Sequence, residues 1–507
     1  MPEPITARQQ FIGAQVSSTA ATAPLETPVV VRGAELIGTA TYNCLAYHDT
    51  TALDRITEAP PLFRVPQFAH NAFARVICAL TAQQIIIATQ FTTLAPLTNA
   101  VLQGWGLTVP QSVRPEILAC GINSTCLFEV AQTNNFLPFV IGEIVAFEIF
   151  ALQIANSGWN DNGALVYDPR LRKAVPCALN CQGYADIIGY APVNSPYNNG
   201  RGPRKLIVGR ERRWEPLLET DGFGFFFRQE HITPHIGFTV QPTLIDEIVM
   251  VERPRYNLKM EVDLLLERLR NLTTDIDRQR DVVFYDNKLS VRNLIQTEVR
   301  TQFNQSYEQE VLFISALDAT EADSTISVWR NKVHFDLVRP TTVIQRRSGE
   351  IIETYSGDRN APGPVSVPAR NYVPFVRIQP HSEYPSGSAC LCQGYQEYTD
   401  AFTQGEYGGV VTNLEIPCVP PLCDIPGMVR ATDMTDLSNI CGESRLDAGL
   451  HFTASVPAGR QACSGIGPKG YELATRLKAN SPAFLPENGH FSDSPRPVCG
   501  DAGGATS

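Results

Sequence analysis

Hydrophobic residues recur every three or four positions in most of the chain beyond residue 66, as they do on the buried face of an α-helix. The stretches with this period are 66–93, 137–156, 243–280 (with one short and one long helix), 293–317, 321–339, 386–403, 428–441 and 443–456. Alternation of apolar and polar residues, which would indicate strands, is scarce. We therefore predict an all-α protein made of two helical bundles with long loops.

Two regions lack the helical period. The first 60 residues are rich in Ala, Thr and Pro and weakly patterned, so we expect an arm that wraps the protein with little regular structure. Residues 157–240 are rich in Gly, Pro, Asn and aromatic residues, which is typical of a long connection that shapes a site. The predicted domains are 1–240, with the arm, a helical bundle and this loop region, and 241–507, a helical bundle that carries the candidate chemistry.

The chain has 507 residues, enough for one large helical unit or for several fused domains. Its 41 basic and 52 acidic residues give a net charge of -11, which argues against a nucleic-acid binder. No stretch approaches the ~18 apolar residues of a membrane span, and the N-terminus lacks the basic start and apolar run of a signal peptide. We expect a soluble protein, either cytoplasmic or exported without such a signal, and its compartment stays open.

Thirteen cysteines include three closely spaced pairs, Cys120/Cys126, Cys177/Cys181 and Cys418/Cys423. Two or three disulfides are expected, and the odd count leaves at least one thiol unpaired unless it links two chains. Zinc binding is the alternative, but no histidine or second CxxC stands near these pairs.

The stretch "DSTISVWRNKVHFDLVRP" carries the first candidate chemistry. Lys332 and Arg339 are separated by two helical turns, so both cations face nearly the same side of the predicted helix. A solvated basic face is the alternative, but apolar neighbours such as Trp329 leave little of this helix for water.

Two later stretches supply further anion-binding groups. In "YPSGSACLCQGY" a turn precedes a predicted helix, so the Ser386 hydroxyl and the Gly387 amide would lie at its N-terminus, where free N–H groups and the helix dipole favour an oxyanion. A simple serine N-cap is the alternative. In "SRLDAGLHF", Arg445 and His451 flank Gly449, which lets another backbone or a bound ion approach.

Together the three stretches supply three cations, a hydroxyl, a helix N-terminus and an imidazole. Such a set suits a tetrahedral oxyanion, because fixed donors and charges meet its oxygens while the imidazole approaches the central atom axially.

The same stretches, read as K-x6-RP, PSG and SR-x3-G-x-H, resemble the three-part signature of the vanadium-dependent haloperoxidases, a family related to the type 2 phosphatidic acid phosphatases. The likeness runs from roughly Arg212 to His451 and includes "RRWEPL", which is similar to a segment of bacterial chloroperoxidases of this type. The residues before it match only in helical character.

The resemblance implies a vanadate cofactor. The residues implied to bind its oxygens are Lys332, Arg339, Ser386, Gly387 and Arg445, and His451 is implied as the axial nitrogen ligand of vanadium. The implied enzyme is an oxidoreductase in which vanadium(V) activates hydrogen peroxide as a Lewis acid with help from the lysine, chloride or bromide is oxidised, and an organic substrate is halogenated. A homodimer is also implied.

Ser388 stands where most members of the family, and the phosphatases, carry a histidine that performs acid-base work. A serine hydroxyl, with its high pKa, cannot replace that histidine near neutral pH. A phosphatase would also use an aspartate four residues past the last histidine, and Ser455 occupies that place. Both departures harm ester hydrolysis more than halide oxidation, so an acid phosphatase becomes the weaker alternative.

The pattern leaves the halide open. His381 matches a histidine of algal bromoperoxidases, and Trp329 matches a tryptophan of fungal chloroperoxidases. Both are candidates for the halide or substrate pocket, and His381 and Ser388 are also catalytic candidates. The alternatives are a backbone-bonded loop residue for His381 and core packing for Trp329. An oxyanion-binding protein that has lost catalysis also stays open.

Overall fold

In the computed structural model, the residues described are 27–70, 72–90, 114–154, 166–168, 173–175, 188–194, 212–220, 226–239, 243–255, 257–347, 349–361, 363–418, 423–479, 481 and 484. Most of them are helical, and the strands among them form four two-stranded antiparallel sheets. The predicted all-α class is thereby confirmed. None of the helices in these ranges has the length and apolar composition that a membrane crossing requires.

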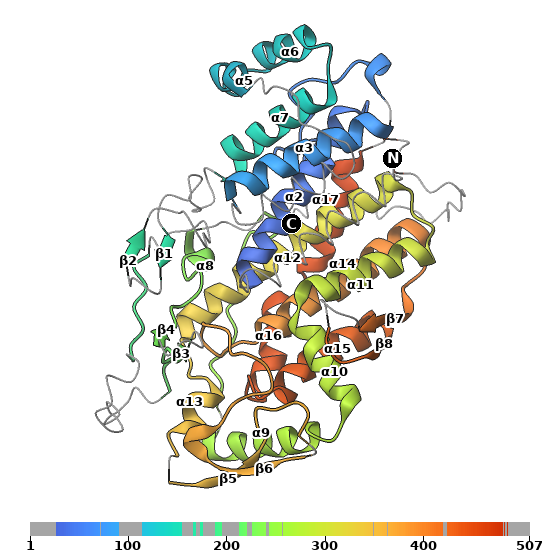
Figure 1. Cartoon of the computed structure of the whole chain (residues 1–507). Helices are drawn as coiled ribbons and strands as arrows, with labels where there is room; N and C mark the ends of the chain where they lie inside the picture. The colour runs from blue at the N-terminus through green and yellow to red at the C-terminus, as the bar shows by residue number, and fades with distance from the viewer. Residues whose placement is uncertain are drawn as a thin grey trace, which may run out of the picture.

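Helix α12, Tyr307–Phe335, runs through the middle of the molecule (Figure 1). It is buried along nearly its whole length, and a capping box between Ser306 and Gln309 fixes its start. Helix α11, Lys288–Gln302, ends just before it. The predicted pair of helices, 293–317 and 321–339, is therefore wrong, because the break lies at residues 303–306.

Polar residues in the middle of α12 account for this error. They look like a helix end in the sequence, but they are buried and paired. Asp318 forms an ion pair with Arg292. The two carboxylate oxygens of Asp323 accept hydrogen bonds from the backbone amides of Thr243 and Leu244, at 2.9 and 2.7 Å. Tertiary partners thus stabilise a helix that its local sequence does not favour.

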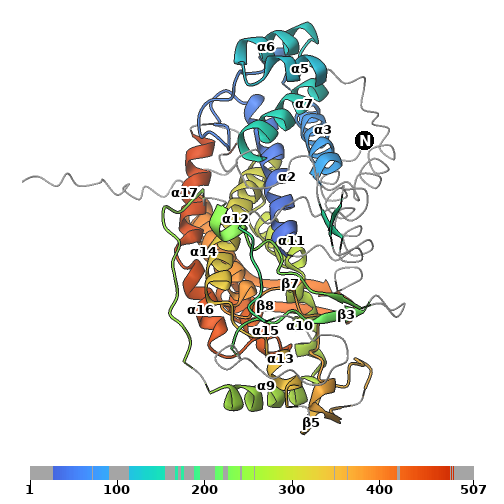
Figure 2. The ribbon, with the colours of Figure 1, turned by 90° about the vertical axis from the view of Figure 1, so that its left-hand side faces the viewer.

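The first of the N-terminal helices packs against α12 and the others pack on it or on one another, which gives the molecule its elongated outline (Figure 2). The N-terminal helices are α2, Thr27–Tyr47; α3, Ala72–Gln90; α5, Arg114–Cys120; α6, Ser124–Thr133; and α7, Pro138–Glu148, which continues into the π-helical turn η2, Ile149–Ile154. The predicted irregular arm is therefore wrong for residues 27–47, and residues 1–26 lie outside the described ranges.

Helix α2 forms because its small residues fit against α12. A Cβ atom at Gly38 would overlap the Asp318 carboxylate, so any larger residue would require the Asp318 side chain to shift from its ion pair with Arg292. Thr39 and Thr41 donate their hydroxyls to the carbonyl oxygens of Glu35 and Ile37, one turn earlier, so these buried hydroxyl groups are satisfied within the helix.

The C-terminal helices surround the other part of α12. They are α14, Gly387–Tyr407; α15, Met434–Asp447; α16, Ser455–Cys463; and α17, Ile466–Lys478. The hairpin of β7, Thr412–Cys418, and β8, Gly427–Asp433, precedes α15. The helix predicted over 386–403 is confirmed. Those over 428–441 and 443–456 are wrong, since a strand occupies 427–433 and an irregular loop occupies 448–454, and α17 was not predicted.

The remaining described elements are short or lie at the lower end of Figure 1. They are η1, Gln67–Ala69; α8, Ile236–Thr239; α9, Leu258–Leu272; α10, Ile276–Asp286; α13, Pro340–Gln345; η3, Ala369–Asn371; and the hairpins of β1, Val166–Asp168, with β2, Lys173–Val175, of β3, Leu218–Thr220, with β4, Phe226–Arg228, and of β5, Ile351–Thr354, with β6, Val365–Pro368. The predicted domain boundary at residue 240 stays a prediction.

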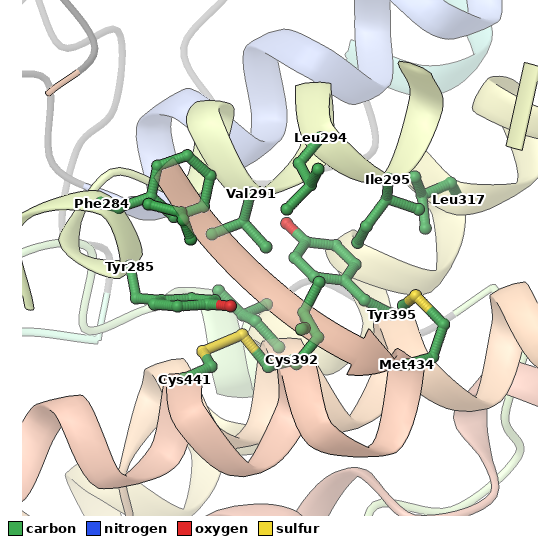
Figure 3. Packing of buried hydrophobic residues seen from close by; sticks show 14 of the residues in the cluster. Phe284, Tyr285, Val291, Leu294, Ile295, Leu317, Cys392, Tyr395, Met434 and Cys441 are labelled. Carbon is green, nitrogen blue, oxygen red and sulfur yellow. A yellow bond between two sulfur atoms is a disulfide. The ribbon is translucent and has the colours of Figure 1, made fainter. Parts of the chain in front are cut away.

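A hydrophobic core holds α14 beside α15. Figure 3 shows side chains from α10, α11, α12, α14 and α15 interdigitating there: Phe284, Tyr285, Val291, Leu294, Ile295, Leu317, Cys392, Tyr395, Met434 and Cys441. The Cys392–Cys441 disulfide lies within this core and joins the two helices.

Five disulfides are present in the described part of the chain. The predicted pairs Cys120–Cys126 and Cys418–Cys423 are confirmed, which excludes zinc binding by them in this state. The other three disulfides join residues far apart in the sequence and bring the number above the expected two or three. They are Cys44–Cys78, Cys390–Cys463 and Cys392–Cys441. Cys177 and Cys181 lie outside the described residues.

Gly459 in α16 lies against the backbone of the turn before α14, and a Cβ atom there would stand 2.3 Å from the Ser386 carbonyl oxygen. Alanine favours a helix over glycine by about 1 kcal/mol. We nevertheless expect Gly459→Ala to lower the free energy of unfolding by about 1–3 kcal/mol, because the backbone must shift to admit the methyl group. Urea denaturation measures this.

Gly349→Ala is the matched control, because its Cβ atom would meet nothing within 4 Å. It should change the free energy of unfolding by less than about 0.5 kcal/mol. Equal stability of the two variants would contradict the close approach of α16 to the turn.

Candidate functional site

The structure brings the three predicted stretches together. Lys332 lies near the end of α12, Arg339 just before α13, Ser386 just before α14, Arg445 in the last turn of α15, and His451 in the loop that follows α15. All five are buried. A small cavity of about 30 Å³ is lined by residues from all three stretches, including Arg339, Gly387, Ser388, Arg445 and His451, whereas Lys332 and Ser386 lie outside its lining.

Lys332 and Arg339 do not lie on one helix, so the predicted shared face is wrong. Helix α12 ends at Phe335, because Asp336 adopts a left-handed conformation with φ 49°. Arg339 lies in the extended segment that follows, as the residue before Pro340. The two cations still converge, because the chain turns back toward the end of α12.

Lys332 fastens the loop before α14. Its ammonium donates to the carbonyl oxygens of Ser382, Glu383 and Pro385, at 3.1, 3.1 and 2.6 Å. All three N–H groups of the side chain are thus in use. Burial, and then the charge of Arg339, lower the pKa of Lys332 well below its usual value.

Arg339 connects the other two stretches. Its Nε donates to the His381 carbonyl oxygen at 2.9 Å, and its Nη1 donates to the Leu450 carbonyl oxygen at 3.1 Å and lies 3.3 Å from His451 Nε2. Its Nη2 lies 3.0 Å from His381 Nδ1. Burial lowers the pKa of Arg339 to about 10, so the side chain stays a cation near neutral pH.

His451 is held by a carboxylate that the sequence did not point to. Its Nδ1 lies 3.0 Å from Glu383 Oε1, which also accepts hydrogen bonds from the Phe452 amide at 3.0 Å and from the Ser455 hydroxyl. Burial raises the pKa of Glu383 to about 7 against the opposing effect of these donors. The only sequence signal for this role of Glu383 was that an acidic residue stands three positions before Ser386.

The N-terminus of α14 provides further donors. Ser386 caps the helix, its hydroxyl accepting from the Ala389 amide at 3.4 Å, and its own N–H donates to the Ser455 carbonyl oxygen at 2.9 Å. The predicted alternative of a serine N-cap is therefore correct, although it does not exclude a second role. The amides of Gly387 and Ser388 open the helix and have no partner within it.

Arg445 leaves one donor free. Its Nη1 donates to Asp286 Oδ1 at 2.8 Å, while its buried Nε finds no hydrogen-bond partner among the described residues. Asp286, at the end of α10, also lines the cavity, and sequence reasoning missed it. Gly449 does leave room for a neighbour, but the neighbours are the hydroxyl of Tyr372 and the side chain of Leu269, with φ 77° at the glycine.

Trp329 and His381 form one wall of the cavity, with ring centroids 5.0 Å apart. The indole N–H of Trp329 donates to the Ile232 carbonyl oxygen at 3.0 Å. Half-buried Ser388 also lines the cavity. Trp329, His381 and Ser388 therefore lie next to the other site residues. Their catalytic and halide-binding roles stay predictions.

Comparisons with known proteins concern the fold and one of its domains. Residues 312–480 match the model of the VCPO second helical-bundle domain. The chain is similar to the crystal structures of a holo-type and an apo-type bacterial vanadium-dependent chloroperoxidase. The holo-type match has a TM-score of 0.69 at 20% identity over 91% of this chain and 94% of that one, and the apo-type match has 0.68 at 20% over 90% and 95%.

A bacterial vanadium-dependent iodoperoxidase also matches, with a TM-score of 0.58 at 14% identity over 93% of this chain and 96% of that one. No curated protein sequence matches the chain. The resemblance predicted from the sequence is confirmed: the chain has a vanadium haloperoxidase-like fold, and the matched domain spans all three signature stretches.

His451 should be neutral, with its proton on Nδ1, at pH 6.5, where an ordinary histidine is about half protonated. Burial, together with the charges of Arg339 and Lys332, lowers the pKa of this imidazole well below its usual value. Because an unfolded histidine takes up a proton near pH 6.5 and the folded one does not, this residue favours unfolding as the pH falls below about 6.5.

Long-range ¹H–¹⁵N correlation spectra of the apoprotein, labelled at histidine and assigned with a His451→Gln variant, report the tautomer directly. The urea-unfolded protein serves as the titrating reference. A ring of His451 that titrates near pH 6.5 in the folded protein would exclude this electrostatic environment.

Proposed function

We propose that this chain, which has the fold of the vanadium-dependent haloperoxidases, is a vanadate-dependent haloperoxidase. It would oxidise chloride or bromide with hydrogen peroxide and so halogenate an organic substrate. The observation that carries the proposal is the meeting of His451 Nε2, Arg339 and the N-terminus of α14 around one small cavity. A homodimer, as the resemblance implies, is part of the same proposal.

The groups around the cavity fit vanadate. Arg445 Nε is a buried donor without a partner among the described residues, and the first amides of α14 are free of helix bonds. Guanidinium groups and a helix N-terminus are the donors that a tetrahedral oxyanion prefers. The oxygens of vanadate would be held by Arg339, Arg445, Ser386 and Gly387, and His451 would supply the nitrogen ligand.

Bound vanadium(V) would supply Lewis acidity toward peroxide. The protein would bind the anion, exclude water from it and keep positively charged side chains next to it. Lys332 contributes first by fixing the loop that carries Ser386, and one of its N–H groups must leave a carbonyl oxygen before it can reach a bound ligand. The surplus of positive charge beside Trp329 and His381 would attract a halide ion.

Ser388 favours a second candidate function, an oxyanion-binding protein without catalysis, because the position lacks an acid-base group. An acid phosphatase is supported less, since a serine cannot protonate a leaving alkoxide near neutral pH. Halide oxidation depends less on an acid-base group at position 388, because water can deliver the protons that the reaction requires.

The first test is halogenation of monochlorodimedone by the purified protein, with and without orthovanadate, hydrogen peroxide, chloride and bromide. We expect turnover only when vanadate, peroxide and a halide are all present. His451→Ala should lower the rate at least about 100-fold, because a direct ligand contributes more than the outer-shell partners that typically account for 10–100-fold.

His334→Ala is the control, since this histidine of α12 is exposed and outside the site. Full activity of His451→Ala would refute the ligand role. Vanadate binding without halogenation would favour the non-catalytic protein, and hydrolysis of a phosphate ester without vanadate and peroxide would favour the phosphatase.

Ser388→Ala should retain at least about a tenth of the wild-type turnover number. The hydroxyl cannot act as an acid or base at neutral pH, so its removal cannot cost the 10²–10⁴-fold that a general acid-base group provides. Steady-state halogenation kinetics measure this, with Lys332→Met as the companion variant that should lose much more. A loss of more than 100-fold in Ser388→Ala would assign the serine a direct catalytic role.

A further inference from the structure

The Glu383 carboxylate is a buried junction between all three stretches of the site. Its side chain is fully inaccessible to solvent, and Oε1 receives donors from His451, Phe452 and Ser455. Its backbone lies just before the second stretch, which begins at Tyr384, and is hydrogen-bonded to the first. The Glu383 N–H donates to the Leu337 carbonyl oxygen at 2.9 Å, and its carbonyl oxygen accepts from Lys332 at 3.1 Å.

These contacts decide which nitrogen of His451 carries the proton. A backbone amide can only donate, so the hydrogen bond from the Phe452 N–H makes Oε1 an acceptor. The guanidinium of Arg339 can also only donate, so His451 Nε2 must accept from it, and the proton of the neutral ring lies on Nδ1, facing Glu383 Oε1. Its Nε2 then presents a lone pair, and this atom lies 3.3 Å from Arg339 Nη1 beside the cavity.

Ser455 bonds to the same carboxylate oxygen as His451. Its hydroxyl donates to Glu383 Oε1, and its carbonyl oxygen accepts the Ser386 N–H at 2.9 Å. Ser455 thus touches both the carboxylate and the turn at the head of α14. A serine there can donate to a carboxylate that comes from elsewhere in the chain, whereas an aspartate at the same place would bring a second negative charge against it.

We propose that Glu383 is the positioning residue of His451: it fixes the Nδ1–H tautomer and the ring orientation, and it increases the donor strength of Nε2 toward a bound metal. The carboxylate is thus supplied by the loop before α14, and Ser455 holds it in place. This inference rests on the proposed function, because it assigns Nε2 the role of the vanadium ligand.

The test compares two oxyanions on the apoprotein by isothermal titration calorimetry. Vanadate can accept a fifth bond from a nitrogen, whereas orthophosphate stays four-coordinate and uses only the surrounding donors. Glu383→Gln keeps the shape and removes the charge. We expect it to weaken vanadate binding about 10–100-fold, as outer-shell partners of metal-bound histidines typically do, and phosphate binding less than about threefold.

Three further variants make the comparison specific. Ser455→Ala leaves the carboxylate in place and should weaken vanadate binding less than about fivefold. The double variant Glu383→Gln/Ser455→Asp returns a carboxylate to the other side of the same contact and should recover most of the lost vanadate affinity. Glu383→Asp keeps the charge but withdraws it by one methylene, and provides the same two-ligand comparison should Glu383→Gln not fold.

The outcomes separate the two proposals. Equal losses for vanadate and phosphate in Glu383→Gln would show a purely structural carboxylate, and no loss for either would also overturn the positioning role. If His451→Ala loses vanadate while Glu383→Gln does not, only the role of Glu383 fails. If the wild-type protein binds phosphate but shows no preference for vanadate, the proposed function and this inference both fail.

Discussion

Burial of three cations beside two imidazoles is the constraint on which the rest of this structure depends. A buried charge without partners costs several kcal/mol, so Lys332, Arg339 and Arg445 persist only because other groups compensate for the lost water. Backbone carbonyls of two loops surround the first two, and the carboxylates of Glu383 and Asp286 supply the opposing charge. The bonds that shape the cavity are therefore the same bonds that hold the loops to the helices.

The sequence predicted the convergence of distant residues better than it predicted their local structure. Lys332, Ser386 and His451 do meet, because a signature of spaced residues reports a site even when the intervening backbone is misread. The helices expected around Arg339 and His451 were wrong, since each is interrupted by a residue in the left-handed region, Asp336 and Gly449. Hydrophobic periodicity does not detect such breaks when apolar residues continue on both sides of them.

Other features could not be predicted from the sequence, because they depend on contacts between residues that are far apart in the chain. Helix α2 has weak local propensity and owes its stability to packing against α12. Glu383 is separated from His451 by 68 positions, so no local pattern relates the carboxylate to the imidazole. Ser455 looked like a simple loss of an acidic group, and only the three-dimensional arrangement shows a carboxylate arriving from another segment.

The two disulfides of α14 give the site a dependence on the surrounding thiol chemistry. Cys390 and Cys392 lie in the first two turns of this helix and are bonded to Cys463 of α16 and Cys441 of α15, the latter one turn from Arg445. In the presence of glutathione or a thiol reductant, exchange at these bonds would remove the covalent links of α14 to both neighbours, while the hydrogen bond from Ser386 to Ser455 and the core shared with α15 would remain. The thiol chemistry of the surroundings thus decides whether the segments that carry the anion site are covalently linked to one another.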